Sequence, residues 1–365
     1  MRIAIDATPL TCATGGIRRY VVELTRALAL HSPGDEIVLL TDQEGWRLPE
    51  TLREIPNVEA PQPQSQPLRT KWWTAGLASA LWRHRIDVFH GSDFSVPYLP
   101  LRPSVLTVHD LSPWKEPPLA PVGSERIRSR TRFLLQLATL VVTPTLAIKR
   151  ELVDRFAIAP SRVAVTPLAA SGDWRPVSDT DVTGWLRHRG LRQPYLVALA
   201  ASQPRKNIDR LLEAWRAARF ECPGLTLVCV GSLQGDTMKR YRQGGVEVLP
   251  SLTDPELQTL LSGAVAFVYP SLYEGFGLPV LEAMRIGVPV ITSQDAAIRE
   301  VAGAAALHVE ATSTKSLTKA LVEVSTNSGL RAKLKSKGIQ RSSQFSWRAT
   351  ALLTRRTYVE AIRRF

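Results

Sequence analysis

Two glutamates, Glu274 and Glu282, lie on either side of a Gly-Phe-Gly turn and are separated by seven residues. The apolar run Ala264–Tyr269 before them predicts a buried strand. Pro279 fits the first position of a helix, where a missing N–H group has no partner to lose. A strand, a glycine-rich loop and a helix in this order direct unpaired backbone N–H groups and the positive end of a helix dipole at the loop. The segment therefore predicts a binding site for an anion such as a diphosphate.

The two carboxylates suit the hydroxyl groups of such a ligand and not its anion. We predict Glu282 on the first turn of the helix, beside the anion, where its carboxylate is suited to accept hydrogen bonds from a ribose. Glu274, before the turn, is suited to do the same for a second polyol. An ordinary helix start with a glycine turn is the competing interpretation.

The string from Tyr269 to Met284, YPSLYEGFGLPVLEAM, resembles the E-x(7)-E signature of the family 4 retaining glycosyltransferases. The resemblance implies a GT-B fold, in which two doubly wound, Rossmann-like α/β domains face each other across a cleft. It also implies that Glu274 contacts the donor sugar and that Glu282 contacts the ribose of the nucleotide. Backbone N–H groups of the loop would hold the diphosphate, namely those of Gly275, Phe276, Gly277 and Leu278.

Two adjacent cations, Arg205 and Lys206, follow another predicted strand and open a helix. Cations at such a place are suited to neutralise a diphosphate leaving group, although a solvated helix start also carries basic residues. The family has an arginine and a lysine in this role, so the resemblance assigns both residues to catalysis, together with Glu274. The sequence departs from the family pattern at Ala200, where glycine is usual, and at Gln203, where glutamate is usual.

Gly15 and Gly16 follow the first predicted strand and open the first helix. Glycines at such a turn allow a positive φ and a close approach of the backbone to a ligand. The resemblance places this loop over the donor phosphates, although a plain strand–helix turn has the same pattern. Arg18 and Arg19 either reach an anion or face solvent.

His109 and Asp110 end an apolar run and are predicted at the carboxyl edge of a sheet. The resemblance implies that His109 lies near the transferred sugar and acts in catalysis, and we place Asp110 on the acceptor side. A capping aspartate and a hydrogen-bonded histidine would give the same pattern. His90 ends another predicted strand, and we interpret it as a second residue of the acceptor side.

The string Asp179-Thr180-Asp181 has the Asp-x-Asp spacing that holds a divalent metal in the other large glycosyltransferase fold. It lies in the irregular stretch Asp173–Arg187 and not at a strand end, so we interpret it as solvated linker. The resemblance implies a mechanism without a metal and without any other cofactor. The nucleoside diphosphate sugar would be a substrate.

The chain has 365 residues, which is more than one typical domain, and 44% of them are hydrophobic. Its net charge of +13 at pH 7 suits nucleic acid, anionic lipid or phosphorylated substrates, but the basic clusters lie in no recognisable nucleic-acid-binding module. Three scattered cysteines, Cys12, Cys222 and Cys229, indicate no disulfide framework and fit a reducing compartment. The sequence shows neither an apolar signal region nor a spanning segment, so we expect a cytoplasmic protein.

Apolar runs alternate with helical patterns along the chain, which is typical of parallel sheets covered on both faces. We predict an N-terminal Rossmann-like domain over residues 1–175 and a C-terminal one over residues 176–346. By resemblance, the first is the acceptor side, the second is the donor side, and a last helix over residues 347–365 crosses back to the first. We predict Pro49–Pro67 as a long surface loop. The predicted strands are Arg2–Asp6, Glu36–Thr41, Val88–His90, Val105–His109, Leu140–Thr143, Val163–Pro167, Tyr195–Ala200, Leu225–Gly231, Val246–Leu249, Val265–Tyr269, Val288–Thr292 and Ala306–Val309.

The segment Leu68–Arg85 mixes tryptophan and arginine at roughly helical spacing. It fits a helix in a membrane interface as well as it fits an amphipathic helix whose tryptophans pack on the first domain. Glycosyltransferases with lipid-linked acceptors use such surfaces. The excess of positive charge would then favour peripheral contact with an anionic membrane, at the inner face of the cytoplasmic membrane.

The predicted function is transfer, with retention, of a hexosyl group from a nucleoside diphosphate sugar to a hydroxyl group of a glycan or lipid-linked acceptor. The strings GGIRRY, HDL, PRKN and EGFGLP are most similar to those of bacterial mannosyltransferases of surface-polysaccharide assembly, which favours GDP-mannose as the donor. One alternative is a GT-B sugar phosphorylase-like enzyme that uses inorganic phosphate, but no pyridoxal phosphate lysine motif supports it. A basic nucleic-acid-binding protein is the alternative from another class, and the paired glutamates argue against it.

Overall fold

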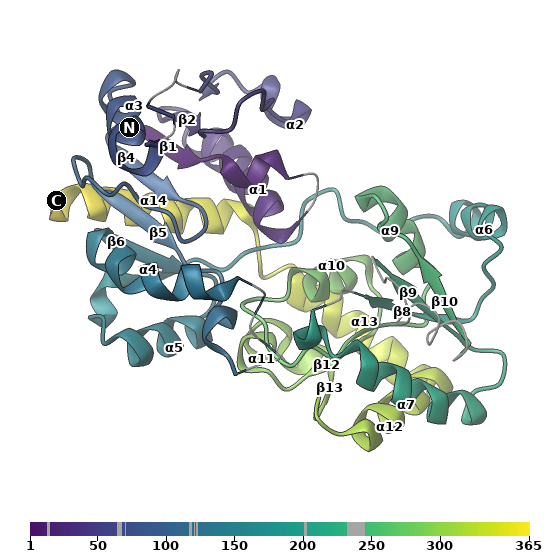
Figure 1. Ribbon diagram of the computed structural model, residues 1–365. Coiled ribbons are helices and arrows are strands. Elements are labelled where there is room, and N and C mark those ends of the chain that lie inside the picture. The colour runs from purple at the N-terminus through teal and green to yellow at the C-terminus, as the bar shows by residue number, and fades with distance from the viewer. Residues whose placement is uncertain are drawn as a thin grey trace. The chain divides into compact units, whose positions relative to one another are not determined.

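The computed structural model describes residues 1–12, 15–63, 68–69, 71–116, 119, 121, 123–200, 203–231 and 245–365. They form two compact units, each built on its own sheet (Figure 1). The first unit contains Met1–Trp114, Val122–Leu168 and Ser346–Phe365, and the second contains Lys115–Pro121 and Ala169–Phe345. The chain passes into the second unit after Leu168, whereas the sequence predicts a boundary after residue 175.

The sheet of the first unit has seven parallel strands in the order β3-β2-β1-β4-β5-β6-β7. The strand order changes direction between β1 and β4. In open α/β sheets, ligands bind at the carboxyl ends of the strands beside such a point, so the loops after β1 and β4 are expected to carry a site. The strands are β1 (Arg2–Asp6), β2 (Glu36–Leu40), β3 (Val58–Glu59), β4 (Val88–Gly91), β5 (Ser104–Thr107), β6 (Leu140–Thr143) and β7 (Val163–Val165).

The sheet of the second unit has six parallel strands in the order β10-β9-β8-β11-β12-β13. Its order changes direction between β8 and β11, so the loops after these two strands are the equivalent place for a ligand. The strands are β8 (Tyr195–Leu199), β9 (Thr226–Val230), β10 (Val246–Leu249), β11 (Ala266–Tyr269), β12 (Val290–Ser293) and β13 (Leu307–Val309).

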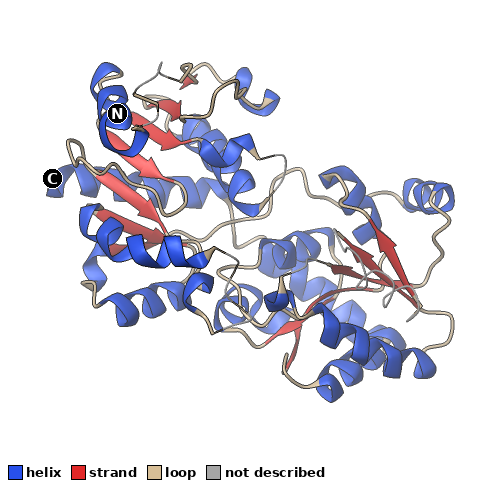
Figure 2. Ribbon diagram, viewed as in Figure 1, coloured by secondary structure: helices blue, strands red, loops and turns tan. Residues whose placement is uncertain are grey.

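Helices cover the sheet of each unit (Figure 2), which explains why the strands have continuous apolar sequences. Ile3 and Ile5 of β1, for example, are both 0% exposed although they point to the same face of their strand and Ala4 between them is equally buried. The first unit has α1 (Gly16–His31), α2 (Glu50–Arg53), α3 (Leu77–Arg83), α4 (Ser124–Leu137), α5 (Leu146–Phe156) and α14 (Trp347–Arg364). The second has α6 (Asp179–His188), α7 (Ile208–Glu221), α9 (Asp254–Ser262), α10 (Leu278–Ile286), α11 (Ala296–Ala302), α12 (Thr314–Thr326) and α13 (Ser328–Ser342).

The predicted α/β class with two doubly wound sheets is confirmed. The interpretation of Pro49–Pro67 as a loop is wrong in part, because α2 and the short strand β3 lie within it; residues 64–67 are outside the described ranges. The sequence does not predict β3, because this strand has only two residues and pairs with β2 alone.

The C-terminal helix α14 belongs to the first unit, where it packs against α1. The Arg355 Nε and Nη2 atoms lie 2.6 Å and 3.1 Å from the two carboxylate oxygens of Asp35, which also pairs with the N-terminal amino group. Burial would raise the pKa of Asp35, but Arg355 and the amino group outweigh burial and lower it. The ends of the chain thus share one buried carboxylate.

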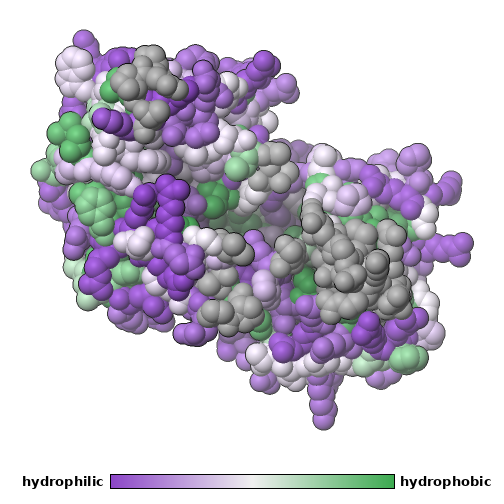
Figure 3. Space-filling model, in the orientation of Figure 1, coloured by the Kyte–Doolittle hydropathy of each residue, from purple (hydrophilic) through white to green (hydrophobic). Residues whose placement is uncertain are grey.

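The tryptophans of the Leu68–Arg85 segment separate into different environments. Trp72 is buried in the apolar cluster beneath β1 and β4, and Trp73 packs against that cluster, whereas Trp82 is 77% exposed. Hydrophilic side chains predominate on the face shown in Figure 3, with smaller apolar areas over the first unit. Within the described ranges, no helix is both long enough and apolar enough to cross a membrane.

Candidate active site

Four side chains meet at the carboxyl ends of β8 and β11 in the second unit. Lys206 Nζ lies 2.6 Å from Glu274 Oε1, and Arg205 Nη1 lies 3.0 Å from Glu274 Oε2. The hydroxyl group of Tyr269 donates to Glu274 Oε1 at 2.9 Å and accepts from Lys206 Nζ at 2.6 Å. We call these four residues the Glu274 cluster. It brings together three side chains that the sequence predicts as catalytic, and it adds Tyr269.

The Glu274 cluster is buried, which makes its charges interact strongly. Burial alone would raise the pKa of Glu274, but Lys206 and Arg205 outweigh burial and lower the pKa to about 2. Burial and the Glu274 charge raise the pKa of Tyr269 well above its ordinary value, so the phenol stays protonated and donates. Two cations therefore share one carboxylate at neutral pH, and a second anion would be attracted to them.

Asn207 fixes the loop of Arg205 and Lys206 against the loop after β11. Its backbone has φ +58°, a left-handed conformation that asparagine adopts more readily than most residues. Its side-chain amide donates to the carbonyl groups of Pro270 at 3.1 Å and Ala311 at 2.7 Å. The cations are thus placed by a rigid turn and by amide hydrogen bonds.

The helix α10 begins directly after the Glu274 cluster, with Gly277 as its N-cap. Gly277 has φ +87°, a conformation that strains other residues, and a Cβ atom there would lie 2.4 Å from Ile298 Cδ1 and displace the end of that side chain. Leu278 is the first helical residue and Pro279 the second, one position later than predicted. The stretch Gly275–Leu278 therefore precedes or opens a helix, where backbone N–H groups lack partners within the helix.

Glu282 is the fifth residue of α10, one position further along the helix than the predicted start at Pro279 gives, so it lies at the beginning of the second turn and not on the first. Glu282 is 1% exposed between the fully buried Leu281 and Ala283. A carboxylate in such surroundings requires polar partners. Its contact with a ribose stays a prediction.

Asp295 is a second carboxyl group close to Glu274, and it lies outside every motif recognised in the sequence. It caps α11, where its carboxylate accepts from the N–H groups of Ala297 and Ile298, both at 3.1 Å. Burial raises the pKa of Asp295 to about 6, and the charge of Glu274 adds to this effect. An aspartate directly before a helical pattern is a sequence signal for a cap, but the proximity to Glu274 comes from the fold.

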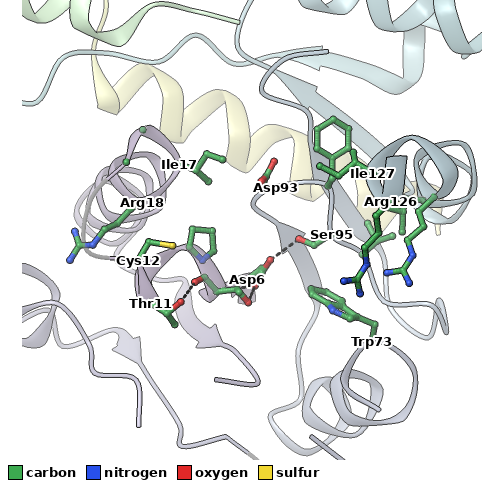
Figure 4. A pocket seen from close by; sticks show the side chains of 18 of the residues that line it. Asp6, Thr11, Cys12, Ile17, Arg18, Trp73, Asp93, Ser95, Arg126 and Ile127 are labelled. Atoms are coloured by element: carbon green, nitrogen blue, oxygen red, sulfur yellow. Dashed lines mark hydrogen bonds between the residues drawn. The ribbon is translucent and has the colours of Figure 1, made fainter. Parts of the chain in front are cut away.

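The first unit has a pocket of about 530 Å³ at the carboxyl ends of β1 and β4, which we call the β1–β4 pocket (Figure 4). Gly15 and Gly16, which the sequence predicts at the donor phosphates, line this pocket, as does Arg18. Gly15 has φ +134° and is the N-cap of α1. In Figure 4 the guanidinium group of Arg18 extends away from Asp6 at the centre of the pocket.

His109 and Asp110 follow β5 in the first unit. His109 Nε2 donates to the carbonyl group of Ser92 at 2.8 Å, and the ring packs edge-on against Tyr20. Burial lowers the pKa of His109, so the ring is neutral near pH 7 and its Nδ1 is then an acceptor. Asp110 accepts from the N–H and hydroxyl groups of Ser112 at 2.8 Å and 2.6 Å, which is the capping role that the sequence left as an alternative.

The interpretation of His90 as an acceptor-side residue is wrong. Its side chain is 0% exposed, with Nδ1 2.5 Å from the Tyr358 hydroxyl and Nε2 2.6 Å from Thr107 Oγ1. Burial lowers the pKa of His90 to about 3, so the ring is neutral. A histidine without exposed surface contacts no acceptor; His90 is a core residue that links β4, β5 and α14.

The Asp-x-Asp string lies in the first turn of α6 and not in a linker, which corrects that part of the interpretation. Ser178 caps this helix by accepting from the Asp181 N–H group. Among the residues that the structure describes, no three His, Cys, Asp or Glu side chains come together as a metal site.

The sequence matches two glycosyltransferase families in succession. Residues 14–170 match the family described as Glycosyltransferase Family 4, and residues 188–341 match the family described as Glycosyl transferases group 1. O-antigen chain mannosyltransferase B from Escherichia coli is 28% identical over 377 residues, which covers 95% of this chain and 96% of that protein. O-antigen chain mannosyltransferase RfbU from Salmonella typhimurium is 28% identical over 233 residues and covers 61% of each chain.

Solved structures share the whole architecture. The structure of HepE from Anabaena in complex with UDP-glucose has a TM-score of 0.74 and 17% identity, and it covers 98% of this chain and 99% of that one. At such identity the likeness shows the fold alone. With the two family matches, it means that the chain belongs to the family 4 glycosyltransferases and is an enzyme with the GT-B fold.

Proposed function

We propose that this enzyme moves a hexosyl group, with retention, from a nucleoside diphosphate sugar to a hydroxyl group of a glycan or lipid-linked acceptor in cell-surface polysaccharide synthesis. The Glu274 cluster beside the start of α10 carries the proposal. It offers two cations and a helix N-terminus to an anion, and a carboxylate to hydroxyl groups, at the switch point of a doubly wound sheet.

The donor would replace contacts that the cluster makes within itself. A diphosphate would take hydrogen bonds from Arg205 and Lys206, and Glu274, released from part of its ion pairs, would accept from hydroxyl groups of the sugar. GDP-mannose is our preferred donor, because several of the similar proteins, O-antigen chain mannosyltransferase B and RfbU among them, are named as mannosyltransferases. The bound UDP-glucose of HepE supports the class of nucleoside diphosphate sugars.

In the proposed reaction the bond between the anomeric carbon and the diphosphate oxygen breaks. The acceptor oxygen forms its bond to the same face of that carbon, and the departing diphosphate takes the acceptor proton. Arg205, Lys206 and the N–H groups of Gly275–Leu278 would stabilise the charge that develops on the leaving group. Glu274 has a pKa of about 2, so it is a hydrogen-bond acceptor and not a proton donor near pH 7.

Proton NMR of the enzyme with GDP-mannose tests both turnover and stereochemistry. We add methyl α-D-mannoside or mannose 1-phosphate as model acceptors and follow GDP and the first anomeric signals. We expect GDP release and α-configured mannosyl products, together with α-mannose from slow hydrolysis. Lys206→Ala should lose this activity, whereas Lys333→Ala, at an exposed lysine of α13, should keep it.

A β-configured first product would overturn retention. Turnover that is unchanged in Lys206→Ala would overturn the assigned site. If the wild type turns over UDP-glucose or another nucleotide sugar but not GDP-mannose, the reaction class stands and the donor assignment is wrong.

A further inference from the structure

The β1–β4 pocket has the size of a ligand site and combines three kinds of chemistry. Its volume of about 530 Å³ falls in the range of roughly 300–1,000 Å³ that small-molecule sites occupy. In Figure 4 the carboxylate of Asp6 lies at its centre, and the indole of Trp73 and the guanidinium group of Arg126 lie on the same side; Arg130 also lines the pocket. The residues that matter here are Asp6, Asp93, Trp73, Arg126 and Arg130.

The two carboxyl groups of the pocket differ in their partners. Asp6 accepts from the N–H and hydroxyl groups of Thr8 at 3.0 Å and 2.7 Å, and from the hydroxyl group of Ser95 at 2.7 Å. Gly91 permits this arrangement, because a Cβ atom there would lie 1.5 Å from the Ser95 carbonyl oxygen. Asp6 is thus committed to the protein.

Asp93 is partly buried, and within the described ranges no hydrogen bond reaches its carboxyl group. In the view of Figure 4 its carboxyl group lies between Ile17 and Ile127. A carboxyl group withdrawn from water without a partner is unfavourable, so a ligand that supplies hydroxyl groups would gain hydrogen bonds there. Asp93 therefore favours a polyol as the occupant of this part of the pocket.

Trp73 presents a fixed indole to the pocket. Its side chain packs against the apolar cluster around Trp72, and its carbonyl group accepts from the Tyr98 N–H group at 2.8 Å. An aromatic face packs well against the C–H groups of a pyranose ring, and a rigid one does so with little loss of conformational entropy. The indole and Asp93 together suit a saccharide.

Arg126 and Arg130 lie one helical turn apart on α4, and both line the pocket with exposed side chains. Guanidinium groups bind phosphate oxygens through paired hydrogen bonds. Arg128 and Arg132, on the same helix, are also exposed but do not line the pocket. The positive charge that α4 brings to the pocket thus comes from one side of this helix, and the guanidinium group of Arg18, which also lines the pocket, extends away from the pocket centre.

We propose that the β1–β4 pocket binds a saccharide that carries a phosphate or diphosphate group, with Asp93 on its hydroxyl groups, Trp73 on its ring and Arg126 and Arg130 on its phosphate. This inference rests on the proposed function, in which such a saccharide is the acceptor. A phosphate linked to a lipid and a phosphate on a free sugar share this chemistry.

Cys12 provides a binding assay that does not depend on turnover. It is exposed and lines the pocket, whereas Cys222 and Cys229 are buried, and burial raises the pKa of both thiols. Alkylation by iodoacetamide, read at each cysteine by mass spectrometry, therefore reports occupancy at Cys12 with two internal references. The probes are mannose 1-phosphate, methyl α-D-mannoside and inorganic phosphate.

We expect mannose 1-phosphate to slow alkylation of Cys12 at concentrations about tenfold or more below those that methyl α-D-mannoside or inorganic phosphate requires. The reason is that the contacts to the sugar and the contacts to the phosphate then add. Farnesyl-diphosphate-linked mannose tests the lipid-linked source against the free sugar phosphate, and tighter protection by the lipid conjugate assigns that source. The proposal would be overturned if inorganic phosphate protected Cys12 as well as mannose 1-phosphate does at the same concentration. It would also be overturned if no probe protected Cys12.

A matched pair of variants separates the pocket from general charge. Arg126→Gln with Arg130→Gln should weaken protection by mannose 1-phosphate about tenfold or more and leave that by methyl α-D-mannoside unchanged. Arg128→Gln with Arg132→Gln removes the same charge from the same helix and should change neither; equal losses in the two pairs would contradict the site. GDP-mannose binding, measured separately by calorimetry, keeps a failure of the proposed function distinct from a failure of the pocket.

Discussion

At the scale of single residues, the two cations of the Glu274 cluster compensate a buried carboxylate, and they are also the groups proposed to bind the donor. The carboxylate needs its cations because it is 6% exposed, and an ion pair broken inside a protein leaves an uncompensated charge. The same cations are the groups that a diphosphate would bind. A donor that enters the site therefore exchanges one anionic partner for another and does not meet free charges.

The first prediction concerns Lys206. Lys206→Ala removes the cation 2.6 Å from Glu274 Oε1 and one group that would stabilise the leaving diphosphate. We expect glycosyl transfer to fall by about 10²–10³-fold, as for the loss of one preorganised charge-stabilising group. The measurement is the rate of GDP formation from GDP-mannose, with Lys333→Ala as the control and thermal unfolding as the check on folding. Wild-type rates in Lys206→Ala would contradict the role.

The second prediction concerns the pH dependence of stability at Asp93. Burial raises the pKa of Asp93 to about 7, and the charges of Asp110 and Asp6 add to this. Between about pH 4 and pH 7 the folded state therefore binds the proton that the unfolded state has released, so stability falls as pH rises through this window. Asp93→Asn keeps the neutral form at every pH.

The difference in free energy of unfolding between Asp93→Asn and the wild type should therefore favour the variant more at pH 8 than at pH 5. We expect this change to be about 1–2 kcal/mol, which is less than the full shift of the pKa would give because the side chain is partly exposed. Urea unfolding at both pH values measures the difference. A gain that is equal at the two pH values would show that Asp93 does not titrate in this window.

Residue types and spacing predicted much of the Glu274 cluster, because Arg205, Lys206 and Glu274 lie in recognisable strings directly after apolar strands. Tyr269 was visible only as the last residue of a strand, and its hydrogen bond to Glu274 depends on how the next loop folds back. The burial of His90 escapes the sequence for the same reason: a histidine at a strand end has the same local pattern whether it faces solvent or the buried Tyr358, which lies 268 positions away in sequence.

At the scale of elements, both sites lie where the strand order of a sheet reverses, and glycines set the turns that form them. The third prediction is that Gly277→Ala destabilises the second unit. The left-handed conformation alone costs about 1–2 kcal/mol in alanine, and the contact with Ile298 Cδ1 adds to it. Urea unfolding measures the loss.

Two further variants make this prediction specific. Gly184→Ala, in α6, places the same methyl group in a helix with no atom within 4 Å, and it should stabilise by about 0.5–1 kcal/mol. Ile298→Val removes the Cδ1 atom, so in the Gly277→Ala background it should restore the steric part of the loss. A harmless Gly277→Ala would contradict the conformation of this loop.

The sequence predicts strands well where the apolar runs are long and poorly where they are short. Central strands such as β1 and β8 have four consecutive buried residues, whereas β3 has two residues, neither of them buried, and gives no apolar run. The bounds of α10 shifted by one residue because Pro279 is tolerated at the second helical position as well as the first.

At the scale of the whole molecule, the C-terminal helix completes the first unit. α14 packs on α1, pairs with Asp35 and supplies the partner of His90. Such contacts between the two ends of a chain follow from topology. The apolar pattern of residues 347–365 predicts a helix, but its place on the first unit is predicted only by the family resemblance. The fourth prediction tests its buried hydrogen bond.

Tyr358→Phe removes the hydroxyl group 2.5 Å from His90 Nδ1 and leaves a buried ring nitrogen without that partner. We expect a loss of about 1–3 kcal/mol in the free energy of unfolding. Tyr98→Phe, whose hydroxyl accepts from the exposed Arg130 at 3.4 Å, should cost much less. Equal effects of the two variants in urea unfolding would contradict the assignment of His90 to the core.

The most direct test of the central claim is a thermal-shift panel with GDP, UDP, ADP and dTDP and with their sugar conjugates, on the wild type and on Lys206→Ala. A ligand that binds only the folded state raises its stability by mass action. We expect a selective shift with GDP and GDP-mannose that is strongly reduced in Lys206→Ala. No shift with any nucleotide, at concentrations far above a plausible dissociation constant, would contradict the assignment of the Glu274 cluster as a donor site.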